Sequence, residues 1–139
     1  MLERRGFYGK TKPHLPPAAD WVKVQLPKMR SAIATVLHAE LETDEKTEAL
    51  RFPDGRRMRL AHASSGQQEV LPLLLLLSRF ALQPPGMTVG LHIEEPEAHL
   101  FPTTQREVVE VMGEVFGLQE ARMSLVITTH SPYILHSVQ

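Results

Sequence analysis

The chain has 139 residues, of which 42% are hydrophobic and 22% charged, as in an ordinary globular domain. Its formal net charge of -1 at pH 7 provides no bulk electrostatic attraction to nucleic acid or to an anionic membrane. The lack of cysteine excludes a disulfide framework and agrees with a reducing cytoplasm. The apolar run at 71–77 is far shorter than the roughly 20 residues that span a bilayer. No secretory signal is recognisable, so we expect a cytoplasmic protein without a membrane segment.

Residues 1–20 are rich in Gly, Pro, Lys and Arg, which predicts an irregular lead-in. Gly9-Lys10-Thr11 matches the end of the phosphate-binding loop G-x-x-x-x-G-K-[ST]. However, Arg4 occupies the position of the first glycine, and Pro13 blocks the helix that should follow. We therefore interpret this segment as an incomplete match.

Residues 21–62 predict a helix followed by an antiparallel meander. Between Asp20 and Leu37 the apolar residues recur every three or four positions, which indicates an amphipathic helix that Pro27 can interrupt. Three short segments of alternating character follow, and Pro53-Asp54-Gly55 is a strong turn signal between the last two. These segments are residues 38–42, 48–52 and 57–61.

Residues 63–139 begin with a leucine-rich helix. Ser64 or Ser65 can cap this helix, with Gln67 or Gln68 as the reciprocal partner of a capping box. Because proline is tolerated mainly in the first turn of a helix, Pro72 places the predicted start at about residues 66–69. The helix should end by about residue 82, before the Pro84-Pro85-Gly86 segment.

A βαβ unit follows, with apolar strands at 87–93 and 123–129 and a helix at about 104–116. This order is typical of a parallel sheet, so we predict an α/β fold. A last helix is expected to begin at Pro132, with Ser131 as its N-cap.

Three acidic residues, Glu94, Glu95 and Glu97, collect where the first of these strands stops. Ligands of parallel sheets bind beyond the carboxyl ends of the strands, and Mg²⁺ prefers oxygen ligands. Neighbouring side chains on a strand point to opposite sides, so Glu94 and Glu95 can divide the work. One can hold the water shell of a metal while the other polarises an attacking water. A strand that simply ends in solvated acids remains the alternative.

His130 follows the second strand, where an imidazole could hydrogen-bond a phosphate or its attacking water. A solvated histidine without a role is the alternative. His92 and His99 together with the acids suggest a zinc site, but their separation does not suit a helical H-E-x-x-H pair, so we discount zinc.

Three segments, at 64–68, 91–100 and 127–132, resemble the signature motif, the Walker B motif with its D-loop, and the switch histidine of ABC-type ATPases. The sequence is most similar to the branch that holds the overcoming-lysogenization-defect (OLD) proteins and related defence ATPases, with the structural-maintenance-of-chromosomes group as cousins. The resemblance covers roughly residues 57–139, and it implies a partial P-loop NTPase fold with a parallel sheet, a small antiparallel meander and an N-terminal helix.

The resemblance also implies roles for individual residues. Glu94 would hold Mg²⁺ through water, although the family usually has aspartate there; Glu95 would orient the attacking water, and His130 would sense the γ-phosphate. Gln67 stands where a second glycine is common. Residues expected to contact the nucleotide of the other subunit are Ser65, Gly66 and Gln68, and those of the D-loop at the dimer interface are Pro96, Glu97, Ala98, His99 and Leu100.

The implied function is ATP hydrolysis by a nucleotide-sandwich dimer. The expected partner is a second ATPase subunit, either an identical copy or a half that carries the phosphate loop, with DNA or a defence-system effector as further candidates. Without a convincing phosphate loop, and with Gln139 only a few residues into the last helix, the chain resembles the C-terminal half of a nucleotide-binding domain. We therefore expect feeble or no turnover in isolation. The alternatives are a non-hydrolysing dimerisation or regulatory module and a metal-dependent nuclease.

Overall fold

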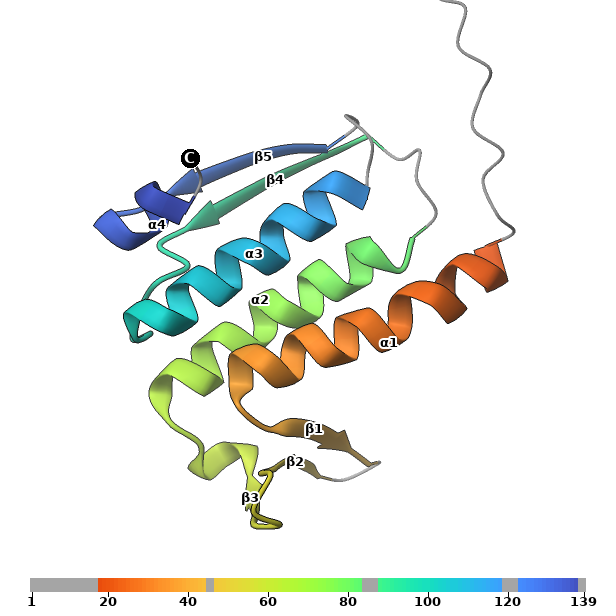
Figure 1. The fold of residues 1–139 in the computed structure, drawn as a ribbon, viewed down its shortest axis with the longest axis vertical. Helices are drawn as coiled ribbons and strands as arrows, with labels where there is room; N and C mark the ends of the chain where they lie inside the picture. Colours follow the sequence, from red (N-terminus) through yellow and green to blue (C-terminus); the bar gives the residue numbers. More distant parts are fainter. Residues whose placement is uncertain (1–17, 45–46, 84–87, 119–122, 138–139) are drawn as a thin grey trace, which may run out of the picture.

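The computed structural model describes residues 18–44, 47–83, 88–118 and 123–137. The segment Gly9-Lys10-Thr11 lies outside these residues, as does most of the predicted lead-in. Three long helices lie side by side, and two sheets lie at different positions around them (Figure 1). The helices are α1 (Ala18–Leu37), α2 (Ser65–Ala81) and α3 (Pro102–Leu118).

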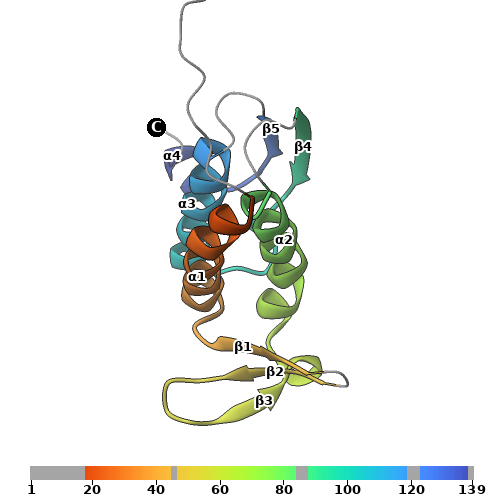
Figure 2. The same ribbon diagram turned by 90° about the vertical axis from the view of Figure 1, so that its right-hand side faces the viewer.

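The first sheet is the predicted antiparallel meander, which lies below the α1–α2 layer in Figures 1 and 2. Each strand pairs with the next, with Leu41 opposite Leu50 and Leu50 opposite Met58 on the face that meets the core. A single 3-10 turn, which the sequence did not predict, links the meander to α2. The elements are β1 (Glu40–Thr43), β2 (Glu48–Arg51), β3 (Arg57–Arg59) and η1 (Leu60–His62).

The second sheet is a parallel pair, β4 (Val89–Glu94) and β5 (Met123–Thr128), with α3 between them in sequence. This confirms the predicted βαβ unit. Leu91 and Ile93 are buried in the core, whereas Val126 on the opposite face of the pair is 54% exposed. The short helix α4 (Pro132–Ser137) follows β5 and packs against α3. None of the helices in the described parts of the chain is long and apolar enough to cross a membrane.

Two prolines lie inside helices that do not break. Pro27 does not interrupt α1, and Pro72 is the eighth residue of α2, well beyond the first turn that the sequence rule favoured. Both prolines are exposed, so their rings face solvent. An interior proline costs about 3 kcal/mol, while each fully buried leucine contributes roughly 1.5–3 kcal/mol. Leu71, Leu74 and Leu77 are buried along α2, so core packing outweighs the cost of Pro72.

The start of α2 is fixed by a capping box at Ser64. The backbone N–H of Gln67 donates to Ser64 Oγ at 3.3 Å, and the Ser64 N–H donates to Gln67 Oε1 at 3.2 Å. Gln67 Nε2 also donates to the carbonyl of Leu37 at 2.7 Å, which satisfies a carbonyl at the C-terminus of α1. Ser64 is therefore the N-cap, and Ser65 is the first helical residue.

Candidate functional site

The candidate site lies at the carboxyl ends of β4 and β5, which are at the same edge of the parallel pair (Figure 1). Glu94 is the last residue of β4 and is paired in register with Thr128, the last residue of β5. The backbone N–H of Glu95 continues the pairing by donating to the Thr128 carbonyl at 2.9 Å. Glu95 then adopts a left-handed conformation with φ of 45°, which turns the chain away from the strand direction.

Glu95 and His130 face each other across this edge. Glu95 Oε1 lies 3.5 Å from His130 Nε2, and the two side chains are 59% and 89% exposed. Both groups are thus accessible to a ligand in solvent. A carboxylate can accept a proton from water, and an imidazole can donate a hydrogen bond to a phosphate oxygen. The expectation that these two side chains share one edge of the sheet is met, whereas their catalytic roles stay a prediction.

Glu94 is exposed beside this pair. Among the described residues no group of three or more His, Cys, Asp or Glu side chains is arranged to hold a metal ion. His92 is exposed within β4, and His99 is paired with Glu69. The carboxylates of Glu94 and Glu95 do not form an all-protein metal cage. They do fit Mg²⁺, which usually keeps several waters and binds through one or two carboxylates together with substrate phosphates.

Glu97 connects the loop after β4 to the loop after β5. Its Oε1 accepts hydrogen bonds from Thr129 Oγ1 at 2.6 Å, from the N–H of His130 at 2.8 Å and from the N–H of Ser131 at 3.1 Å. Burial of the carboxyl acts to raise its pKa, but the bonds from the Thr129 hydroxyl and from backbone N–H groups outweigh burial and hold the pKa of Glu97 below its ordinary value. The carboxylate form is therefore favoured.

A second connection between the same loops runs through the buried side chain of Gln105 on α3. Gln105 Nε2 donates to the carbonyl of Leu100 at 2.9 Å, and Gln105 Oε1 accepts from the hydroxyl of Ser131. The Ser131 Oγ in turn accepts from the N–H of Tyr133 at 3.2 Å, which confirms Ser131 as the N-cap of α4. The pattern that predicts α3 carries no signal for the role of Gln105, because that pattern rests on apolar spacing and one of the two partners, Ser131, lies 26 positions away.

The start of α2 lies directly against the predicted D-loop, residues 96–100. Gly66 is buried, and a Cβ atom at this position would lie 2.5 Å from the carbonyl oxygen of His99 and 3.1 Å from Leu100 Cδ2. Glu69 Oε2 and His99 Nδ1 are 2.7 Å apart. Gly66 is therefore required for the close approach of α2 to its own D-loop, a steric role in addition to the predicted contact with nucleotide.

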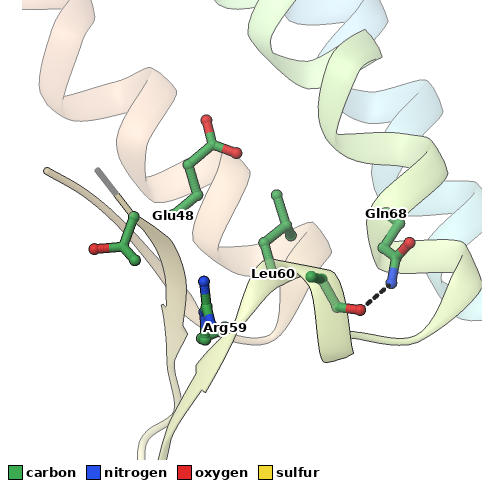
Figure 3. A pocket seen from close by; sticks show the side chains of 6 residues that line it. Glu48, Arg59, Leu60 and Gln68 are labelled. Atoms are coloured by element: carbon green, nitrogen blue, oxygen red, sulfur yellow. Dashed lines mark hydrogen bonds between the residues drawn. The ribbon is translucent and has the colours of Figure 1, made fainter. Parts of the chain in front are cut away.

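The other two predicted signature residues differ from each other in their surroundings. Ser65 is exposed at the first position of α2. Gln68 Nε2 instead donates to the carbonyl of Ala61 at 3.4 Å, marked by the dashed line in Figure 3, and to the carbonyl of Ala63 at 2.9 Å. Gln68 also lines a cleft of about 420 Å³ between the meander and α2, and this cleft contains none of the residues at the ends of β4 and β5.

Two parallel strand ends that carry adjacent acids and a histidine, and a serine-glycine helix start packed on the loop after β4, agree with an ABC/SMC-like P-loop ATPase domain. The chain belongs to the AAA ATPase domain family, whose family model matches residues 10–135. The ABC-type resemblance is thus confirmed, and the assignment to the OLD-like branch stays a prediction. No curated protein matches the chain at a significant level.

Solved structures with a similar fold include heads of SMC proteins. The SMC head domain from Thermotoga maritima has a TM-score of 0.56 and 14% identity, over 86% of this chain and 44% of that one. A second structure comes from work on the ATP-driven dimerization and DNA-stimulated activation of SMC ATPases. It has a TM-score of 0.57 and 10% identity, over 87% of this chain and 78% of the other. An SMC head bound to the C-terminal winged-helix domain of ScpA has a TM-score of 0.58 and 14% identity, over 85% and 36%. The chain thus spans less than half of the length of two of these three structures.

Proposed function

We propose that this chain binds ATP and contributes to its hydrolysis to ADP and phosphate as one part of a nucleotide-sandwich assembly. The observation that carries this proposal is the pair Glu95 Oε1 and His130 Nε2, which lie 3.5 Å apart and exposed at the ends of adjacent parallel strands. Membership of the AAA ATPase domain family supports the choice of nucleotide.

In the proposed reaction, a water oxygen bonds to the γ-phosphorus as the bond from phosphorus to the β–γ bridging oxygen breaks. Glu95 orients this water and accepts its proton, an assistance worth about 10²–10⁴ in rate. His130 donates a hydrogen bond from its ring to a γ-phosphate oxygen, where negative charge must be stabilised.

Glu94 is the residue proposed to hold Mg²⁺, through water. The metal would supply neutralisation of the phosphate charges when it is bound. Glu94 is suited to this task because it is exposed and follows the last buried residue of β4, so its carboxylate can meet a hydrated ion without desolvation.

We further propose that Ser65, Gly66 and Gln68 serve the nucleotide held by a second subunit, with the D-loop, residues 96–100, at the interface. Free N–H groups at the start of a helix attract phosphate. For Gln68 this role requires its amide to leave the carbonyls of Ala61 and Ala63. Dimerisation driven by ATP is described for a similar SMC structure, and binding of a winged-helix partner for another.

The phosphate loop of this assembly is proposed to come from outside the described residues. The sequence holds no complete G-x-x-x-x-G-K-[ST] motif. We infer that a further segment or a partner subunit grips the triphosphate, and that this chain alone has feeble or no turnover. Kinship with the OLD-like branch, a cytoplasmic location, and DNA or an effector as further partners belong to the same proposal.

The test combines the chain with a subunit or segment that carries a phosphate loop and measures phosphate release with Mg²⁺ and ATP. Glu95→Gln should lower turnover by about 10²-fold or more and should leave ATP-dependent association intact. Glu114→Gln, on the exposed side of α3, makes the same charge change and serves as the control.

A second candidate function is a module that binds nucleotide without cleaving it, and the incomplete phosphate-loop motif favours it. In that case Glu95→Gln would leave phosphate release at the level of the unmodified assembly. Robust hydrolysis by the chain alone, abolished by Lys10→Ala, would instead contradict our interpretation of Gly9-Lys10-Thr11.

A further inference from the structure

The Glu97 side chain is directed within its own chain, although the resemblance to ABC-type ATPases implies that it belongs to a D-loop expected at a subunit interface. Its Oε1 accepts three hydrogen bonds, all from the three residues that follow β5: Thr129, His130 and Ser131. Its Oε2 is buried and has no hydrogen-bond partner among the described residues. Neither oxygen is therefore placed to take up a nucleotide or a metal ion.

His130 depends on its backbone for its position. Its side chain is 89% exposed, and its recorded partner is Glu95 at 3.5 Å. An exposed ion pair of this kind contributes little to holding two side chains in one geometry. The His130 N–H, by contrast, is bound at 2.8 Å to a carboxylate oxygen, and hydrogen bonds to charged acceptors are about twice as strong as neutral ones. The backbone bond is thus the stronger constraint.

Glu97 itself is held in place on both sides. The N–H of Ala98 donates to the Glu95 carbonyl at 3.0 Å, and the N–H of Leu100 donates to the Glu97 carbonyl at 3.0 Å, so the loop is internally closed. Gln105 bonds to Leu100 and to Ser131, which ties the same two loops together from α3. Movement of Glu97 therefore moves the segment that carries His130.

We propose that Glu97 is a positioning residue that holds His130 opposite Glu95 by binding the backbone of the loop after β5. This role rests on the proposed hydrolysis, in which His130 meets the γ-phosphate. It assigns Glu97 an intramolecular task that is separate from contact with substrate or with a second subunit.

The first experiment measures backbone amide hydrogen exchange on the complete chain by NMR. In Glu97→Ala, exchange at His130 and Ser131 should become about tenfold faster or more, as expected for loss of a hydrogen bond to a charged acceptor. The Glu95 amide, which donates to Thr128 rather than to Glu97, is the internal reference and should keep its rate. Glu114→Gln should change none of these rates.

A second variant makes the test independent of Glu97 substitutions. Thr129→Val removes the hydroxyl that donates to Glu97 Oε1 and also accepts from the Ser131 N–H at 2.9 Å. It should accelerate exchange at Ser131 and His130, and Thr129→Ser should restore the slow rates. Unchanged exchange in Glu97→Ala, or equal acceleration of the Glu95 amide, would overturn the positioning role.

The second experiment measures hydrolysis in the assembly with a phosphate loop. Glu97→Ala should lower kcat by about 10–100-fold through misplacement of His130, with little change in KM for ATP. Added to His130→Ala, it should cause no further loss, because both substitutions remove the same contact. Additive losses would count against the proposal. If the unmodified assembly does not hydrolyse ATP, the proposed function fails, while the exchange result still decides whether Glu97 positions His130.

Discussion

Substitution of Gly66 by alanine tests the close approach of α2 to the D-loop. The new Cβ would lie 2.5 Å from the His99 carbonyl oxygen, whereas real contacts of this kind essentially never fall below 3.0 Å. The neighbouring backbone would have to retreat by about half an ångström. The loop resists this retreat because the Leu100 carbonyl accepts a hydrogen bond from Gln105 Nε2 and the Leu100 N–H donates to the Glu97 carbonyl.

Two effects of opposite sign set the magnitude. Overpacking of a tight site costs about 1–3 kcal/mol, while replacement of a helical glycine by alanine gains up to about 1 kcal/mol. Gly66 is only the second residue of α2, so its gain is at the lower end. We expect a net loss of about 1–2 kcal/mol in the free energy of unfolding, or roughly 3–7 °C in Tm for a chain of this size.

Gly113 provides a matched control. It lies in α3, is exposed, and has no atom within 4 Å of a Cβ built on it. Gly113→Ala should therefore stabilise the protein by about 0.5–1 kcal/mol. Urea denaturation can be followed by the fluorescence of Trp21, whose indole N–H donates to the Ala81 carbonyl at 2.8 Å between α1 and α2. Equal stability of the Gly66→Ala and Gly113→Ala proteins would refute the steric reasoning.

Two further predictions concern the core and the dependence on pH. Leu77→Ala should lower the free energy of unfolding by about 2–5 kcal/mol, because the Leu77 side chain is 0% exposed. Leu76→Ala, at a side chain that is 40% exposed, should cost well under half as much. Equal losses of the two variants in urea denaturation would contradict the observed packing of α2. The pKa of Glu97 is lowered in the folded state, so its stabilising contribution is complete above the ordinary value of 4.5 and is lost as pH falls below this value through the folded pKa. Glu97→Gln should flatten the acid limb of the stability curve, and an unaltered limb would show that other carboxyls cause it.

The order of elements could be predicted from the sequence because it depends on local patterns. Apolar spacing located the long helices, the Pro53-Asp54-Gly55 turn located the meander, and Ser131-Pro132 located the start of α4. The local rule for proline failed at Pro27 and Pro72, because the contacts that stabilise those helices come from other elements. Local propensity is a weak prior when a buried face decides the outcome.

The candidate site, like the fold, could be predicted only where it depends on local patterns. Parallel strands end at one edge, so Glu95 and His130 could be expected to meet there. Their supports could not be predicted. Glu97 binds residues 32 to 34 positions away, and Glu69 reaches His99 across 30 positions. No spacing pattern in a single sequence encodes contacts of this range.

The loop after β4, residues 95–101, also carries backbone conformations that its residue types do not favour. Glu95 and His99 have φ of 45° and 56°, and left-handed conformations cost non-glycine residues of order 1–3 kcal/mol each. Such conformations persist only where surrounding contacts determine them. Here the bond from the Glu95 N–H to the Thr128 carbonyl fixes one end of the loop, and the bond from Gln105 Nε2 to the Leu100 carbonyl fixes the other. Because Glu97 lies between these two fixed points, its carboxylate is held where its Oε1 accepts the three hydrogen bonds from the loop after β5.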